Sequence, residues 1–246
     1  ESIIRDDERG LVLYLRSFKD DRLTHRILDY HGAFLVMTEE EQMMRVLQDI
    51  GPTIAIGKPG SKLPGIGAGR RYVEESEWKN VVKEYVNRAQ IVVIRASETH
   101  GLQWELKLSR ENLSPEQLVV IIPTPPYIDY KNFIDKAEQE LSVNMPKFIA
   151  FGETQYALAS SSGLVYFDEK WKGHFSPFST NVVISSLLAP WYAPYEATFR
   201  DAFKPVFDNL SITWNKPGFH FSPIIFIIVF IIVTISVSML ASFLTK

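Results

Sequence analysis

The chain has 246 residues, of which 46% are hydrophobic and 22% are charged, so it is long enough for a domain with a sizeable core. Its net charge of −3 and the lack of a basic block argue against general nucleic-acid binding, and we expect no nucleic-acid partner. The absence of cysteine excludes disulfides, thiolate zinc sites and cysteine nucleophiles. The five histidines are scattered without an HExxH motif, so we expect no metal site.

The first predicted elements are a buried strand, a helix and a second strand. The apolar run LVLYL at 11–15 predicts the first strand. A capping box, Thr38 followed three residues later by Glu41, predicts the start of a helix that ends before Gly51-Pro52. The second strand is predicted at 53–56.

The same alternation continues to about residue 126. Further elements are predicted as a helix from Trp78, a strand at 91–94, a helix opening at 104–108 and a strand at 118–122. Short, fully apolar strands that alternate with amphipathic helices are typical of a parallel sheet covered on both faces. Ligands of such three-layer α/β sheets bind in the loops at the carboxyl ends of the strands.

After residue 130 the pattern changes to a C-terminal α+β elaboration. Short strands are predicted at 148–151, 156–159 and 164–167, followed by an amphipathic helix around 199–207 that Pro205 should kink or break. We therefore expect an α/β domain at 1–130 and an extension with a juxtamembrane connector at 131–222.

Residues 223–244 form an uncharged apolar segment, IIFIIVFIIVTISVSMLASFL in its core. About 20 such residues span a bilayer as a helix, which predicts a single-pass membrane protein. Lys and Arg residues before this segment favour a cytoplasmic position for the soluble domain. Thr234, Ser238 and Ser242 recur every four residues, as helix–helix contacts require, although small residues are also tolerated there without a partner.

Three stretches in the first half of the chain resemble a Toll/interleukin-1 receptor (TIR) domain, in the form found in bacterial membrane proteins. They are YLRSF at 14–18 with the acidic pair after it, the GxPG loop at 57–60, and IVVIRASETHGLQWEL at 91–106. The resemblance covers 11–126 and implies a flavodoxin-like or TIR-like three-layer parallel sheet. It also implies self-association into a homo-oligomer.

Enzymatic TIR domains cleave NAD at the nicotinamide–ribose bond, and the resemblance assigns the catalytic carboxylate to Glu105. A carboxylate beside the ribose can stabilise an oxocarbenium-like transition state, as in glycosidases. NAD would then be a substrate, with no further cofactor required. Trp104 directly precedes Glu105 here, whereas enzymatic members have more residues between the two. The alternative is a glutamate in the first turn of a helix, favoured by the helix dipole.

A glycine-rich loop from Gly57 to Arg71 is the second candidate site. Glycines such as Gly57 and Gly60 let backbone N–H groups turn toward an anion, and Lys58 and Arg70 add positive charge. This combination fits the pyrophosphate of a nucleotide. The alternatives are a surface loop, or a contact between copies as the TIR resemblance implies.

Four residues complete the predicted site. Arg16 and Arg95 each follow a predicted strand and can reach the same ligand, unless they are ordinary solvated or ion-paired arginines. His100 lies in the loop before Glu105 and is a candidate ligand contact. Trp104 is a further candidate, and a core aromatic is the simpler interpretation of its indole.

The sequence therefore supports two hypotheses. The first is a membrane-anchored TIR-like enzyme that cleaves NAD on oligomerisation, in a bacterial defence or stress response. The second is a non-catalytic TIR-like signalling module that binds a nucleotide or a protein and is coupled to the membrane helix. The glutamate favours the first hypothesis, and the spacing around Trp104 with the long extension favours the second.

Overall fold

The computed structural model of the chain describes residues 8–17, 39–57, 69–74, 76–124, 128–147, 161–178 and 196–212, all within one compact unit. In chain order the elements are β1 (Leu11–Leu15), α3 (Glu39–Ile50), β2 (Thr53–Gly57), β3 (Gly69–Tyr72), α4 (Trp78–Val86), β4 (Ala89–Arg95), α5 (His100–Asn112), β5 (Leu118–Pro123), α6 (Tyr130–Leu141), β6 (Ser161–Phe167), β7 (Gly173–Pro177) and α8 (Glu196–Asn209). A single turn of 3-10 helix, Pro115–Gln117, precedes β5.

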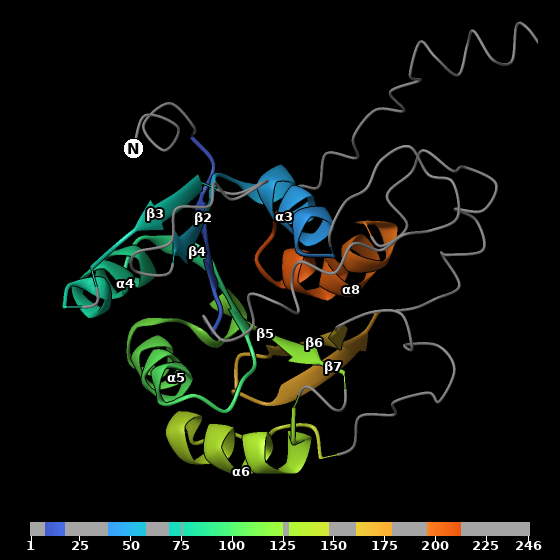
Figure 1. The fold of residues 1–246 in the computed structure, drawn as a ribbon. Helices are drawn as coiled ribbons and strands as arrows, with labels where there is room; N and C mark the ends of the chain where they lie inside the picture. Colours follow the sequence, from blue (N-terminus) through green and yellow to red (C-terminus); the bar gives the residue numbers. More distant parts are fainter. Residues whose placement is uncertain are drawn as a thin grey trace, which may run out of the picture. The chain divides into compact units, whose positions relative to one another are not determined.

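The strands form one mixed, mostly parallel sheet of seven strands in the order β3-β2-β1-β4-β5-β6-β7 (Figure 1). The strands from β3 to β5 are all parallel, and Leu15 of β1 lies opposite Ile94 of β4. β6 and β7 extend the sheet beyond β5 in the antiparallel sense, with Val120 opposite Val165. Parallel neighbours need long crossovers, and α3 and α5 lie in the connections from β1 to β2 and from β4 to β5. The protein is therefore an α/β fold.

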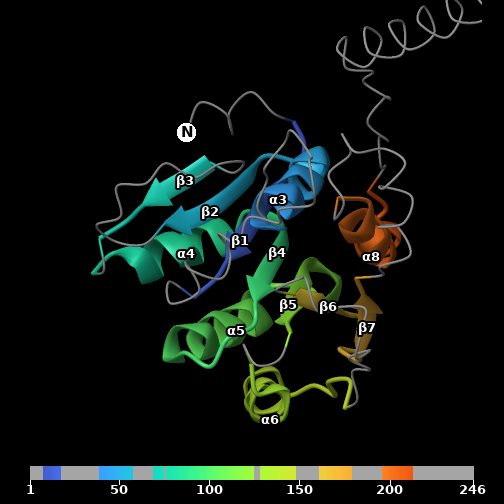
Figure 2. The same cartoon turned by 45° about the vertical axis from the view of Figure 1, so that its right-hand side comes forward.

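Helices cover both faces of the sheet (Figure 2). Helices α4, α5 and α6 pack on one face, called here the α5 face, and α3 and α8 pack on the other, called the α3 face. Along β4, Val92 and Ile94 are buried on the α5 face, whereas Ile91 and Val93 are buried on the α3 face. This double burial explains why the central strands have no alternation of polar and apolar residues.

The structure confirms the strands predicted at 11–15, 53–56, 91–94, 118–122 and 164–167, and the helix that ends before Gly51. Helix α6 and strand β7 were not among the predicted elements. Both lie after residue 128. Strand β7 adds to the same sheet, and helix α6 packs on its α5 face.

Two local predictions were wrong, and at Pro205 the structure excludes one of the two predicted outcomes. Helix α5 begins at His100 and not at Trp104, because Gly101, a poor helix former, conceals its first turn in the sequence. The predicted glycine-rich loop contains β3, an edge strand held by backbone pairing to β2, and an edge strand tolerates charged side chains. Pro205 does not break α8, whose buried Phe199 and Phe203 pack in the core of the α3 face.

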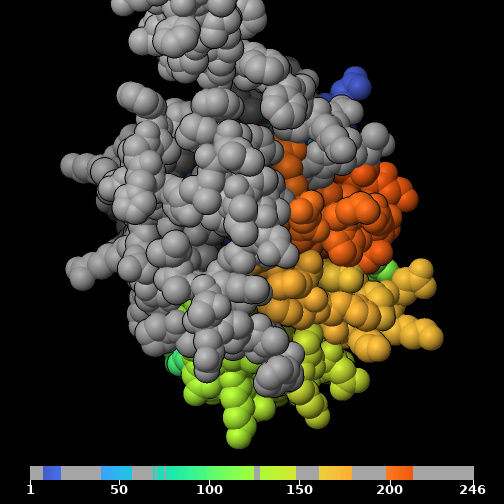
Figure 3. Space-filling view, turned by 90° about the vertical axis from the view of Figure 1, so that its right-hand side faces the viewer, coloured from blue at the N-terminus to red at the C-terminus, as the bar shows by residue number. Residues whose placement is uncertain are grey.

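Helix α8 and the β6–β7 hairpin lie side by side on one surface of the molecule (Figure 3). Phe178, directly after β7, meets Phe199 of α8 edge to face, with 4.8 Å between the ring centroids. The described part of the C-terminal extension is thus packed on the sheet itself.

Within the described ranges, no helix is long and apolar enough to cross a membrane. The predicted membrane segment at 223–244 and the predicted strands at 148–151 and 156–159 lie outside these ranges.

Arg110, near the end of α5, joins three elements of the fold. Its Nε donates to the carbonyl oxygen of Leu141 at 2.8 Å, at the end of α6. Its guanidinium also lies 4.5 Å from the ring centroid of Trp171, in the turn of the β6–β7 hairpin. One side chain therefore ties α5 and α6 to the hairpin.

We expect Arg110→Met to lower the free energy of unfolding by about 2 kcal/mol, since it removes a charge-assisted hydrogen bond and a cation–π contact. Equilibrium urea unfolding of the purified chain measures this loss. The control is Lys107→Met, at an exposed position of the same helix, which should change stability by less than about 0.5 kcal/mol. Equal effects of the two substitutions would contradict the assignment.

Candidate functional site

The strand order reverses at the carboxyl edge between β1 and β4. From β1 the chain goes to β2 on one side, and from β4 it goes to β5 on the other side. In open α/β sheets a crevice forms at this point, and ligands bind there. Arg16 directly follows β1, and Arg95 is the last residue of β4. Both predicted arginines therefore lie at the reversal point.

The two arginines also belong to the same face of the sheet. Leu15 and Ile94 are paired and are both buried on the α5 face. Because side chains alternate along a strand, the next residue on each chain, Arg16 and Arg95, belongs to the α3 face. The register thus places Arg16 and Arg95 on neighbouring chain segments at one end of the sheet, on the same face.

Arg16 forms a buried ion pair with the first turn of α3. Its Nε lies 2.8 Å from Oε1 of Glu40, and both side chains are only 8% exposed. The position of Arg16 is set by the buried strand β1 that precedes it, and the position of Glu40 is set by the amphipathic pattern of α3. The sequence pointed to Arg16 but not to Glu40, although the acidic start of the helix was visible in the capping box.

Arg95 is even more buried, at 2% exposure. Its Nη1 donates to Oγ of Ser161 at 2.6 Å. Ser161 opens β6 and lies opposite Pro123 of β5, so the antiparallel extension returns the chain to the carboxyl edge. Sequence reasoning missed Ser161, which is 66 residues away from Arg95 and part of no motif.

Glu105 lies in the second turn of α5 and not in the first, because the helix begins at His100. It shares the buried side of α5 with Leu102 and Leu106 and is 8% exposed. Burial raises the pKa of this carboxyl from 4.5 to about 8. A carboxyl with so strongly shifted a pKa is a candidate for proton or charge chemistry.

Glu105 and the two arginines lie on opposite faces of the sheet. Helix α5 covers the α5 face, whereas Arg16 and Arg95 belong to the α3 face. The structure therefore places the two arginines on one face, where they bind Glu40 and Ser161, and leaves Glu105 on the other. A ligand that contacts all three residues has to cross the edge of the sheet.

Trp104 packs against Trp78 of α4 edge to face, with 4.9 Å between centroids and an interplanar angle of 73°. Nζ of Lys79 lies 5.4 Å from the centroid of the Trp104 ring. Both indoles are half-buried against the core of the α5 face, which agrees with the interpretation as core aromatics. His100 is exposed, with Nδ1 at 3.4 Å from Oε1 of Gln103.

The glycine-rich segment is described only in part. Lys58 and Gly60 lie outside the described residues, Gly57 ends β2, and Arg70 belongs to β3 opposite Ala55. Because β2 separates β3 from β1, the backbone of Arg70 is not at the reversal point.

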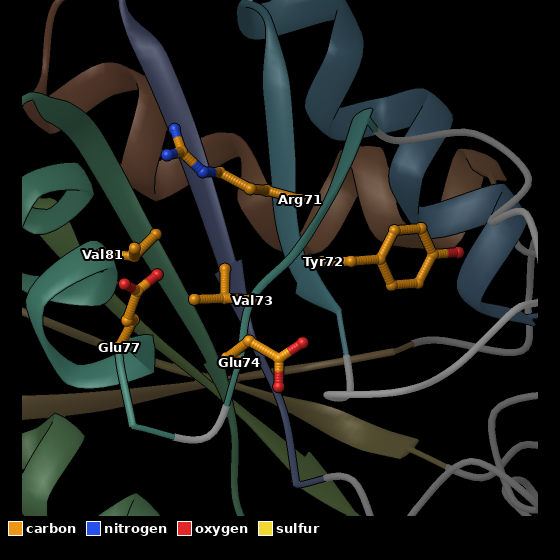
Figure 4. A pocket seen from close by; sticks show the side chains of 6 residues that line it. All are labelled: Arg71, Tyr72, Val73, Glu74, Glu77 and Val81. Atoms are coloured by element: carbon orange, nitrogen blue, oxygen red, sulfur yellow. The ribbon is translucent and has the colours of Figure 1, made fainter.

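A cavity of about 180 Å³ lies between β3 and α4 (Figure 4). Arg71, at its upper edge in the view, donates from Nη1 to the hydroxyl of Tyr85 on α4 at 3.0 Å. Glu74 and Glu77 line the opposite side. Arg71 thus holds β3 against α4, and not at the carboxyl edge between β1 and β4.

Metal-ligating side chains do not gather in the part of the chain that the structure describes. No group of three or more His, Asp or Glu residues is placed to hold an ion there.

The raised pKa of Glu105 makes stability depend on pH in a defined direction. In the unfolded chain this carboxyl ionises near pH 4.5, but in the folded chain only near pH 8. Between these values the folded state binds more protons, so its stability falls as the pH rises. From pH 5 to 7.5 the wild type should lose roughly 3 kcal/mol more than Glu105→Gln.

Urea unfolding at the two pH values measures this difference. Glu111→Gln, at an exposed position of α5, is the control and should follow the wild type. Equal losses of stability in the wild type and in Glu105→Gln would show that the carboxyl ionises normally.

Comparisons with protein-family models, with curated proteins and with solved structures found no match to this chain.

Proposed function

We propose that this chain is a membrane-anchored, TIR-like signalling module that binds a nucleotide of the NAD class at the carboxyl edge between β1 and β4. The observation that supports this proposal is the pair of buried arginines, Arg16 and Arg95, on neighbouring strands where the strand order reverses. Guanidinium groups bind phosphates through two parallel hydrogen bonds, and a pyrophosphate offers a charge to each arginine.

The strand order supports the TIR-like assignment. The order β2-β1-β4-β5 corresponds to the first four positions of a flavodoxin-like sheet, if β3 is counted as an added edge strand. The antiparallel strand β6 occupies the position of the fifth parallel strand. The fold would thus be a TIR-like sheet that the β6–β7 hairpin of the extension continues beyond β5.

Membrane anchoring and self-association belong to the same proposal. The apolar segment 223–244 supports a single-pass anchor with the described unit on the cytoplasmic side. An anchor confines the copies to two dimensions and raises their local concentration. A homo-oligomer would then form at lower expression levels than in solution.

NAD cleavage is the second candidate function, and Glu105 is the observation that favours it. Its buried carboxyl lies in the second turn of α5, the helix that follows β4, and its pKa is raised to about 8. A dinucleotide carries its phosphates in the middle and a ribose at each end. With the phosphates at Arg16 and Arg95, one ribose could cross the edge toward α5.

The binding proposal predicts a loss of nucleotide affinity when the planar guanidinium of either arginine is replaced by an ammonium group of the same charge. Arg16→Lys and Arg95→Lys should each weaken NAD binding by about tenfold or more, since an ammonium cannot form the two parallel bonds. Isothermal titration of the full chain in detergent with NAD, NADP and ADP measures the affinity. Arg88→Lys, at an exposed position after α4, should leave it unchanged.

A wild-type chain that binds none of the three nucleotides would refute the proposal. Unchanged affinity in both substituted chains would move the binding site away from the reversal point.

The cleavage proposal predicts that nicotinamide release requires an ionised Glu105. Glu105→Gln should abolish release by the clustered chain, and Glu111→Gln should not. In the wild type, kcat/KM should rise with pH and level off above about 8, because the ionised fraction of the carboxyl rises through its pKa.

Chromatography of the reaction mixture measures the nicotinamide. Full activity of Glu105→Gln would refute the role of this residue. No release by the assembled wild type, from NAD or from NADP, would leave only the binding function.

A further inference from the structure

Helix α3 is tied at both ends by arginines from other parts of the chain. At its start, Glu40 pairs with Arg16, the arginine of the candidate site. At its end, Oδ2 of Asp49 pairs with Nη2 of Arg200 on α8, whose side chain is 12% exposed. The helix thus joins two regions that are distant in the sequence, the crevice and the C-terminal extension.

A third arginine holds the end of α3. Nη1 of Arg9 donates to the carbonyl oxygens of Gln48 and Asp49, at 3.0 and 3.1 Å. These are last-turn carbonyls, which have no partner inside a helix. The end of α3 is therefore held by two arginines and its start by one.

Between its ends, α3 shares a core with α8 on the α3 face of the sheet. Met43 and Leu47 of α3 belong to the same buried cluster as Phe199, Phe203 and Val206 of α8. Close-packed interiors transmit a displacement instead of absorbing it. A shift of α3 therefore disturbs its packing against α8.

We propose that α3 couples the crevice between β1 and β4 to helix α8, so that an anion bound by Arg16 loosens the contact between α3 and α8. This inference rests on the proposed function for the identity of the anion, a nucleotide phosphate. The coupling itself depends only on contacts within the chain.

The two states differ in the partner of Arg16. Without a ligand, its guanidinium binds the carboxylate of Glu40. A phosphate at the crevice competes with that carboxylate for the same donors. Because Glu40 is buried, the loss of the Arg16 cation makes the buried position of its carboxylate unfavourable. The first turn of α3 then moves to bring this carboxylate to water.

The consequence at the far end follows from the rigidity of a three-turn helix. Tilting α3 shifts Asp49 relative to Arg200 and opens the packing of the two helices. Since the predicted membrane segment follows α8 in the sequence, α8 is the element through which the state of the crevice would be passed on.

Hydrogen–deuterium exchange of the full chain tests the coupling without any ligand. Arg16→Gln removes the cation that pairs with the buried carboxylate of Glu40, and the amides of 196–209 in α8 should then exchange about tenfold faster. Arg45→Gln is the control on α3, at an exposed position, and should leave α8 unchanged. Arg200→Gln should in turn accelerate exchange in the second turn of α3, whose amides are the first with partners inside the helix.

Helix α6, on the opposite face of the sheet, separates coupling from general destabilisation. Its amides should keep their wild-type exchange rates in Arg16→Gln. Equal acceleration of α6 and α8, or no acceleration of α8, would overturn the inference.

Addition of ADP to the wild type tests the link to the proposed function. We expect ADP to bind and to accelerate exchange in α8. If ADP binds and α8 does not respond, the coupling is refuted and the proposed site stands. If no nucleotide binds to the wild type and Arg16→Gln still accelerates α8, the proposed function fails and the coupling stands.

Discussion

The central strands β1, β4 and β5 carry no charged side chain before their last residues, and they are buried on both faces. A sheet of this kind can exist only between two layers of helices, since each exposed face would bring apolar side chains into water. The same constraint confines the polar side chains of these strands to their ends. Arg95 is at such an end and Arg16 follows another, so both charged side chains lie at the carboxyl edge of the sheet.

The pattern of buried strands could be predicted from the sequence because each is a short apolar run bounded by polar or turn residues. The positions of β3 and Ser161 could not, since both are set by pairing with distant strands. β3 is the sequence GRRY, which contains no strand pattern, and only β2 makes it a strand. Ser161 reaches Arg95 because β6 runs antiparallel to β5, and local sequence does not specify that direction.

The candidate site shows the same division. Arg16 and Arg95 were predicted because residues that follow apolar strands come together at the carboxyl edge of a parallel sheet. Glu40, the partner of Arg16, depends on how α3 lies on the sheet. The pKa of Glu105 depends on which side of α5 is buried, and the late predicted start of that helix concealed this. The residue types were visible in the sequence, but the contacts between residues that are distant in the chain were not.

The position of β6 has a consequence for the synthesis of the chain. Ser162 bonds to the backbone of Ile122, 40 residues earlier, so the outer edge of β5 stays uncovered until that much more chain has left the ribosome. At about 5–20 residues per second this lasts several seconds. During that time the apolar edge LVVII can pair with another extended chain, so β6 protects the sheet from aggregation as well as completing it.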